Sequence, residues 1–125
     1  MSRGGIETQI IENSEVGLGD NEFETGLITV PGNSKIKKGV VLKRAGSKFA
    51  PVTNTATEKP VAVNPKEIEN KNAAPADLSL RAIISGPVRA DLLLIGNNVT
   101  TDDQNDMLRA TSIIPIKQND ISRTE

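Results

Sequence analysis

Residues 78–84 read Leu-Ser-Leu-Arg-Ala-Ile-Ile, a pattern typical of a β-strand. Apolar and polar side chains alternate from Leu78 to Arg81, and the stretch ends in a wholly apolar run, Ala82–Ile84. A period of two indicates a strand with one buried face, and the closing apolar run indicates that the strand enters a core. Ser85-Gly86-Pro87 follows and predicts a turn.

Further short apolar runs on either side of this stretch also predict strands. The runs at 40–43 and 49–52 flank a loop that contains Gly46, which predicts a hairpin, and Pro51 predicts that its second strand lies at a sheet edge. The run 88–95 suits a strand or a buried helix, and its flanking turns favour a strand. The remaining strands are expected at 27–30, 61–63 and 112–116, and the polar stretch 65–75 is expected to form a surface loop or one helical turn.

Thr101-Asp102-Asp103-Gln104 predicts the start of a short helix. Thr101 can accept a hydrogen bond from a free N–H of the first turn, while Gln104 reaches back to the backbone of Thr101. The same acids begin like a calcium loop, but Met107 occupies a ligand position and no glycine follows, so a helix start is favoured over a metal site. The helix is expected to run from Asp102 to Ala110.

These elements predict an α+β fold that is mostly β, built of barrel-like or β-tulip sheets with one short C-terminal helix. We expect an extended N-terminal arm at residues 1–25, a single β-rich domain at 26–117 and a frayed tail at 118–125.

The composition favours a binding protein. Hydrophobic residues make up 36% of the chain and only Phe23 and Phe49 are aromatic, so the core should be thin and completed by association with other chains. The net charge of −1 argues against nucleic-acid binding, which normally needs a basic surface. No apolar run is long enough for a membrane span and no signal segment is recognisable, so we expect synthesis in a cytoplasm and no membrane partner.

The sequence offers no recognisable catalytic constellation. The chain has no histidine and no cysteine, which excludes the common triads, zinc sites and thiol chemistry. It contains no glycine-rich phosphate-binding motif either. We therefore expect no enzyme activity, no cofactor and no metal. A small hydrolase that uses carboxylates is the alternative from the catalytic class.

One patch of the N-terminal arm is rich in β-forming residues and is the candidate binding site. It contains Ile6, Thr8, Ile10 and Ile11, and it has no partner strand nearby in the sequence. Such a segment can add a strand to the sheet edge of another chain. The alternative is a terminus that has no binding role.

Charge is distributed unevenly along the chain. Residues 1–25 contain six acids and one base, whereas residues 33–49 contain six bases and no acid. The acidic arm is therefore expected to dock on the basic hairpin of its own chain or of a neighbour. Two separately solvated segments are the alternative, because exposed ion pairs contribute little.

The order of features from 27 to 116 resembles the lambda-type phage head decoration proteins. The resemblance rests on a glycine-bearing hairpin (38–49), a short apolar strand after a polar loop (59–63), a strand leading into Ser85-Gly86-Pro87-Val88, an aliphatic stretch (91–95), a short helix (102–110) and a closing strand (112–116). Where such proteins often carry a glycine in the central apolar strand, this chain has Ala62-Val63-Asn64.

The resemblance implies a homotrimer on the outer surface of the virion, bound at three-fold positions of the expanded capsid. There it would stabilise the shell against the pressure of packed DNA, with the major capsid protein as partner and the arm residues Ile6, Thr8, Ile10 and Ile11 as the capsid contact. A tail-associated or surface-associated β-rich structural module is the nearest alternative.

Overall fold

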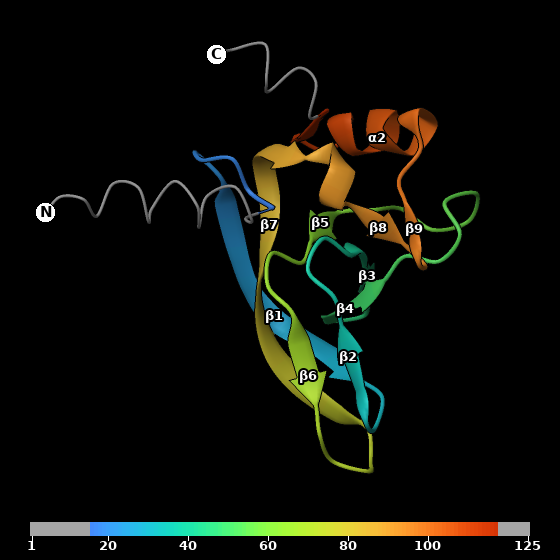
Figure 1. Ribbon diagram of the computed structural model, residues 1–125. Helices are drawn as coiled ribbons and strands as arrows, with labels where there is room; N and C mark the ends of the chain where they lie inside the picture. The colour runs from blue at the N-terminus through green and yellow to red at the C-terminus, as the bar shows by residue number, and fades with distance from the viewer. Residues whose placement is uncertain (1–15, 118–125) are drawn as a thin grey trace, which may run out of the picture.

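The strand predicted at residues 78–84 is present and is the longest element of the fold. In this computed structural model, which describes residues 16–117, it runs as β7 from Ala76 to Arg89. Its first ten residues pair antiparallel with β1, Glu22–Val30, apart from an irregularity at the start of β1. The two strands form a long twisted ribbon along one side of the molecule (Figure 1).

The predicted turn at Ser85-Gly86-Pro87 is wrong, because β7 continues through it. Gly86 has a φ of 101°, a conformation open to glycine, and its N–H donates to the carbonyl of Ser112 at 2.9 Å. The side-chain amide of Asn21 donates to the carbonyls of Ser85 and Pro87. The sequence of this segment is typical of a turn, but residues distant in the sequence provide hydrogen-bond partners for its backbone N–H and C=O groups.

Five strands close into a barrel, which confirms the predicted β-rich, barrel-like fold. The strand order is β1-β4-β3-β5-β7, and β7 closes the ring by pairing with β1. The predicted hairpin is present as β3 and β4, and β10 extends the sheet as a strand parallel to β7. The remaining bounds are Val41–Ala45 for β3, Lys48–Pro51 for β4, Ala62–Val63 for β5 and Ile113–Ile116 for β10.

Barrel closure contradicts the prediction that Pro51 marks a sheet edge. β4 lies between β3 and β1, and its parallel contact with β1 pairs Phe49 with Ile28. Pro51 is the last residue of β4 and lies opposite Leu42. A proline is tolerated at the end of an interior strand, where a missing N–H interrupts little of the ladder.

The stretch 65–75 contains a strand that the sequence did not predict. Ile68–Asn70 forms β6 and pairs antiparallel with β2, Ser34–Ile36. The buried side chain of Asn70 donates to the carbonyls of Val30, Pro31 and Ala74 and so fixes the end of this small sheet. This pairing joins segments more than 30 residues apart, so neither one shows it locally.

The aliphatic stretch 88–95 is not one strand. It finishes β7, forms a 3-10 helix at Ala90–Leu92 and then enters β8, Leu94–Ile95. β8 pairs with β9, Asn98–Val99, across a turn at Gly96. The carbonyl of Ala90 accepts the N–H of Leu93, which closes the single helical turn.

The predicted capping box is present at the start of α2, Asp102–Arg109, the helix seen at one end of the barrel in Figure 1. The Thr101 hydroxyl accepts the N–H of Gln104, and the Gln104 side chain accepts the N–H of Thr101. The acids that resemble the start of a calcium loop therefore belong to a helix N-terminus.

The folded body extends further toward the N-terminus than the expected boundary at residue 26. β1 begins at Glu22, and Val16 is fully buried. Gly17 bridges to Val88, and the N–H of Leu18 donates to the carbonyl of Pro87. The tail expected at 118–125 lies outside the described residues.

Two clusters of apolar side chains form the core, on opposite faces of the barrel wall made by β3, β5 and β7. Alternation along each strand sends neighbours to opposite sides: Leu42, Ala62 and Ala82 belong to one cluster, which we call the barrel cluster, and Val41, Val63 and Ile83 to the other, the outer cluster. The barrel cluster also holds Phe49 and Leu80. The outer cluster is completed by residues that cover the wall from outside, namely Val16, Leu93, Ile95, Leu108 and Ile113.

Candidate protein-binding groove

A groove opens where β5 separates from β7. The two strands pair only at Val63 and Ile83, after which Asn64 turns the chain away. The buried Asn64 side chain donates to the carbonyls of Ile36 and Lys37, at 3.4 and 3.0 Å. Pro65 follows and has no N–H with which to continue a ladder. The Asn64-Pro65 pair therefore marks the point at which the two strands diverge, as the two arms of a fork do.

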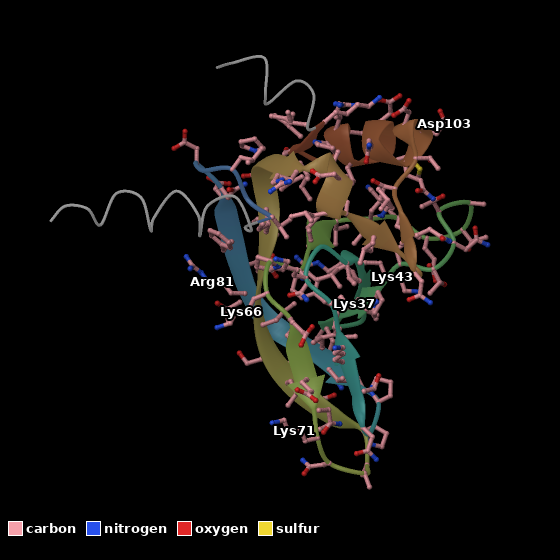
Figure 2. All side chains as sticks on the ribbon, viewed as in Figure 1. Lys37, Lys43, Lys66, Lys71, Arg81 and Asp103 are labelled. Atoms are coloured by element: carbon pink, nitrogen blue, oxygen red, sulfur yellow. The ribbon has the colours of Figure 1, made fainter. Side chains whose placement is uncertain are left out.

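The space inside this fork, which we call the fork groove, has a volume of about 740 Å³. One wall comes from the β7 residues Ser79, Leu80 and Arg81, and the other from the segment that connects β5 to β6. Figure 2 shows Arg81 and Lys66 projecting on the same side of the molecule. The groove is lined by Phe23, Lys38, Asn64, Pro65, Lys66, Glu67, Ile68, Ser79, Leu80 and Arg81.

The groove is mainly basic. It contains three cationic side chains, Lys38, Lys66 and Arg81, against one acid, Glu67. Glu67 also lies 3.7 Å from the ammonium of Lys35 on the neighbouring strand β2. Within residues 16–117, neither Lys66 nor Arg81 forms a salt bridge. Lys66 and Arg81 thus present positive charge that no salt bridge within residues 16–117 neutralises.

Phe23 gives the groove an apolar surface beside its cations. The guanidinium of Arg81 lies 4.1 Å from the centre of the Phe23 ring, a cation–π contact that holds both side chains in place. The ring is 37% exposed, as part of an outward-facing row on β1 that includes Leu27 at 43%. Thr25 separates the two side chains, which lie about 13 Å apart along the strand, so of this row only the Phe23 ring contributes to the groove.

A stretch of β7 has an unpaired backbone edge along the groove. From Ala76 to Ser85 its first edge pairs with β1, while its second edge pairs with β5 at Ile83 and with β10 from Gly86 onward. Among the residues that the structure describes, residues 77–81 pair with no strand on that second edge. Alternate residues of a strand direct N–H and C=O groups to each side, so this edge can accept an extended peptide.

Within residues 16–117, the acidic segment expected to dock on the basic hairpin makes one such contact, between Glu24 and Arg44. The two terminal guanidinium nitrogens of Arg44, Nη1 and Nη2, donate to the carboxylate of Glu24, at 2.8 and 2.6 Å. This contact lowers the pKa of Glu24 and raises that of Arg44. Other bases of the hairpin region pair elsewhere, Lys43 with Glu58 and Lys48 with Asp77.

The candidate site residues predicted from the sequence, Ile6, Thr8, Ile10 and Ile11, lie outside the described residues, and their role stays a prediction. The groove residues were not predicted. Arg81 alternates with Leu80 and Ala82 and is therefore expected on an outer face, but nothing local indicates that Phe23 and Lys66 lie beside it. Phe23 meets Arg81 through the pairing of β1 with β7, and Lys66 lies beside them on the connection between β5 and β6.

The described residues contain no group of three or more side chains suited to hold a metal ion. They also contain no helix with the length and apolar character that a membrane span needs. A comparison with known protein families gives no match, and no curated protein matches the chain.

Proposed function

We propose that this chain is a structural assembly protein that binds another protein and performs no catalysis. The observation that carries this proposal is the fork groove. It combines an unpaired strand edge, three cationic side chains and an exposed aromatic ring, which together suit an extended peptide. The small closed barrel supplies the rigid scaffold on which these groups are held.

The most specific form of the proposal is a decoration protein of a phage head. On this proposal three copies sit on the outer surface of the expanded capsid at its three-fold positions, with the major capsid protein as partner. The support is the resemblance in the order of elements together with the β-rich fold. A ligand that binds the expanded shell better than the unexpanded one stabilises the expanded state by mass action, and many copies multiply the effect.

The test is to mix the purified full-length protein with expanded and unexpanded phage shells that lack their decoration protein. Sedimentation followed by cryo-electron microscopy then reports binding and position. The proposal expects saturable binding to expanded shells alone, with density at the three-fold positions. Equal binding to both shells, or none, would reject the capsid assignment.

A further inference from the structure

We propose that the fork groove binds residues 6–12 of a second copy of this chain, laid as an added strand along residues 77–81 of β7. In this proposal the arm residues contact a second copy of the chain, in place of the capsid contact that the resemblance implies for them, and the extended peptide that fills the groove comes from that copy. The inference concerns contact between copies and does not depend on the capsid assignment.

Charge complementarity selects the N-terminal segment as the occupant. Residues 1–15 carry three acids, Glu7, Glu12 and Glu15, and one base, Arg3. The groove carries the opposite balance, three bases and one acid. Attraction between such surfaces steers association and sets the register in which the two partners meet.

The spacing of apolar residues in the segment also matches the groove. In an extended chain Ile6, Thr8 and Ile10 lie on one face, while Glu7 and Gln9 lie on the other. Glu12 lies on the same face as the isoleucines Ile6 and Ile10. Phe23 and Arg81 also share one face of the β1–β7 pair, where they are in cation–π contact. The face of the segment that carries the isoleucines can thus cover the Phe23 ring and bring the carboxylate of Glu12 to Arg81. The backbone of the segment supplies the hydrogen bonds that the second edge of β7 lacks.

The direction of the chain at Val16 indicates that the segment in the groove comes from a neighbouring copy and not from the same chain. Residues 16–18 run antiparallel to the end of β7: the N–H of Leu18 donates to the Pro87 carbonyl at 3.0 Å, and the N–H of Arg89 donates to the Val16 carbonyl at 2.8 Å. Followed toward the N-terminus, the chain therefore runs toward Arg89 and away from the groove residues Ser79–Arg81. A groove that receives the segment of a neighbour forms a head-to-tail contact, and such contacts close into a ring when the rotation permits.

Site-directed crosslinking tests this pairing directly, because the chain has no cysteine of its own. One full-length variant carries Thr8→Cys and another carries Ser79→Cys. When the two are mixed and oxidised, a disulfide between the two variants should form. A matched control replaces Ser79→Cys with Ser47→Cys in the exposed β3–β4 turn and should give little crosslink.

Two outcomes of the crosslinking would overturn the proposal. The first is an equal yield with Ser79→Cys and Ser47→Cys, because the contact would then be unspecific. The second comes from a chain that carries both Thr8→Cys and Ser79→Cys. If this chain forms only an internal disulfide, and does so independently of its concentration, the segment occupies the groove of its own copy.

Charge reversal provides an independent readout. Lys66→Glu and Arg81→Glu should each weaken self-association of the full chain by about tenfold, measured by sedimentation equilibrium. Lys71→Glu is the matched control, because this lysine lies outside the groove lining. Glu12→Lys mixed with Arg81→Glu should restore part of the loss. Unchanged association in both groove variants, with folding verified by circular dichroism, would reject the proposal even if the protein binds capsids.

Discussion

Among the glycines of residues 16–117, Gly39 combines a positive φ with the shortest distance from an added Cβ to another atom. Its φ is +88°, its N–H donates to the Asn64 carbonyl at 2.6 Å, and its carbonyl accepts the N–H of Leu94. A Cβ placed on Gly39 would lie 1.8 Å from the carbonyl oxygen of Leu92. This glycine thus lets the turn before β3 pack directly against the 3-10 helix.

We expect Gly39→Ala to be strongly destabilising, with Gly46→Ala as its matched control. Gly46 also has a positive φ, +65°, but no atom lies within 4 Å of its Cβ position. The control should therefore lose about 1–2 kcal/mol of unfolding free energy from backbone strain alone. Gly39→Ala should lose about 1–3 kcal/mol more because of the clash. Urea unfolding followed by far-ultraviolet circular dichroism measures both, and equal losses would contradict the packing argument.

Glu58 makes the stability of the β4–β5 connection depend on pH. Its carboxylate bonds to the Lys43 ammonium and accepts the N–H groups of Thr53 and Asn54, at 2.7 and 3.0 Å. The contact with Lys43, followed by the two backbone N–H groups, lowers the pKa of Glu58 from 4.5 to about 2. The folded state thus favours the charged form.

The sign of the pH dependence follows from this lowered pKa. The stabilisation by Glu58 should be fully present above pH 4.5 and should be lost as the pH falls through about 2. Wild type should therefore exceed Glu58→Gln in unfolding free energy near neutral pH, and the gap should narrow as the pH falls below 4.5. Urea titrations at several pH values measure the gap, and a gap independent of pH would disprove the role of this carboxylate.

At the scale of elements, α2 is too short to be stable alone. It has eight residues, and isolated helices of that length are marginal in water. Its buried Leu108 joins the outer cluster, and the Thr100 hydroxyl donates to the buried Asn105 side chain at 2.6 Å. Packing and capping therefore act together on this helix.

Thr101→Ala should lower the unfolding free energy by about 1 kcal/mol, because the N–H of Gln104 loses its acceptor. Thr101→Ser keeps the hydroxyl and should fall within a few tenths of a kcal/mol of wild type. Thermal and urea unfolding of the three proteins give the comparison. An equal loss in both variants would assign the effect to the threonine methyl group instead of the cap.

At the scale of the whole molecule, the barrel wall joins the two clusters into one cooperative unit. β3, β5 and β7 each contribute side chains to both faces, so neither cluster can separate without disturbing these strands. The long β1–β7 ribbon then ties the barrel to the small β2–β6 sheet (Figure 1).

We expect Leu42→Ala in the barrel cluster and Leu93→Ala in the outer cluster to destabilise the same transition. Both side chains are fully buried, and such truncations cost about 2–5 kcal/mol each. Ile114→Ala is an exposed aliphatic control and should cost much less. Circular dichroism and amide hydrogen exchange should report one transition in each variant. Early loss of protection confined to α2 and β10 in Leu93→Ala would show two separable units.

Much of the fold could be predicted because its signals are local. Alternation at residues 78–84, the glycine-bearing hairpin and the capping box at Thr101 each depend on residues within one element. The errors arose where a distant partner decides the backbone. The residues around Gly86 are typical of a turn, but hydrogen bonds with Ser112 and Asn21 hold them in a strand. The stretch 65–75 is typical of a loop, but Ile68–Asn70 forms a strand because it pairs with β2.

The candidate groove shows the same division. The sequence by itself determined which segments can be strands, where the helix begins and that the N-terminal segment is acidic and β-forming, because these properties belong to adjacent residues. Only the tertiary structure decided that β5 leaves β7 at Asn64 and that Phe23, Lys66 and Arg81 line the resulting fork groove. Phe23 and Arg81, which are 58 positions apart in the sequence, become neighbours through the hydrogen-bonded register of β1 and β7. Register is a property of a pair of strands and not of either strand alone.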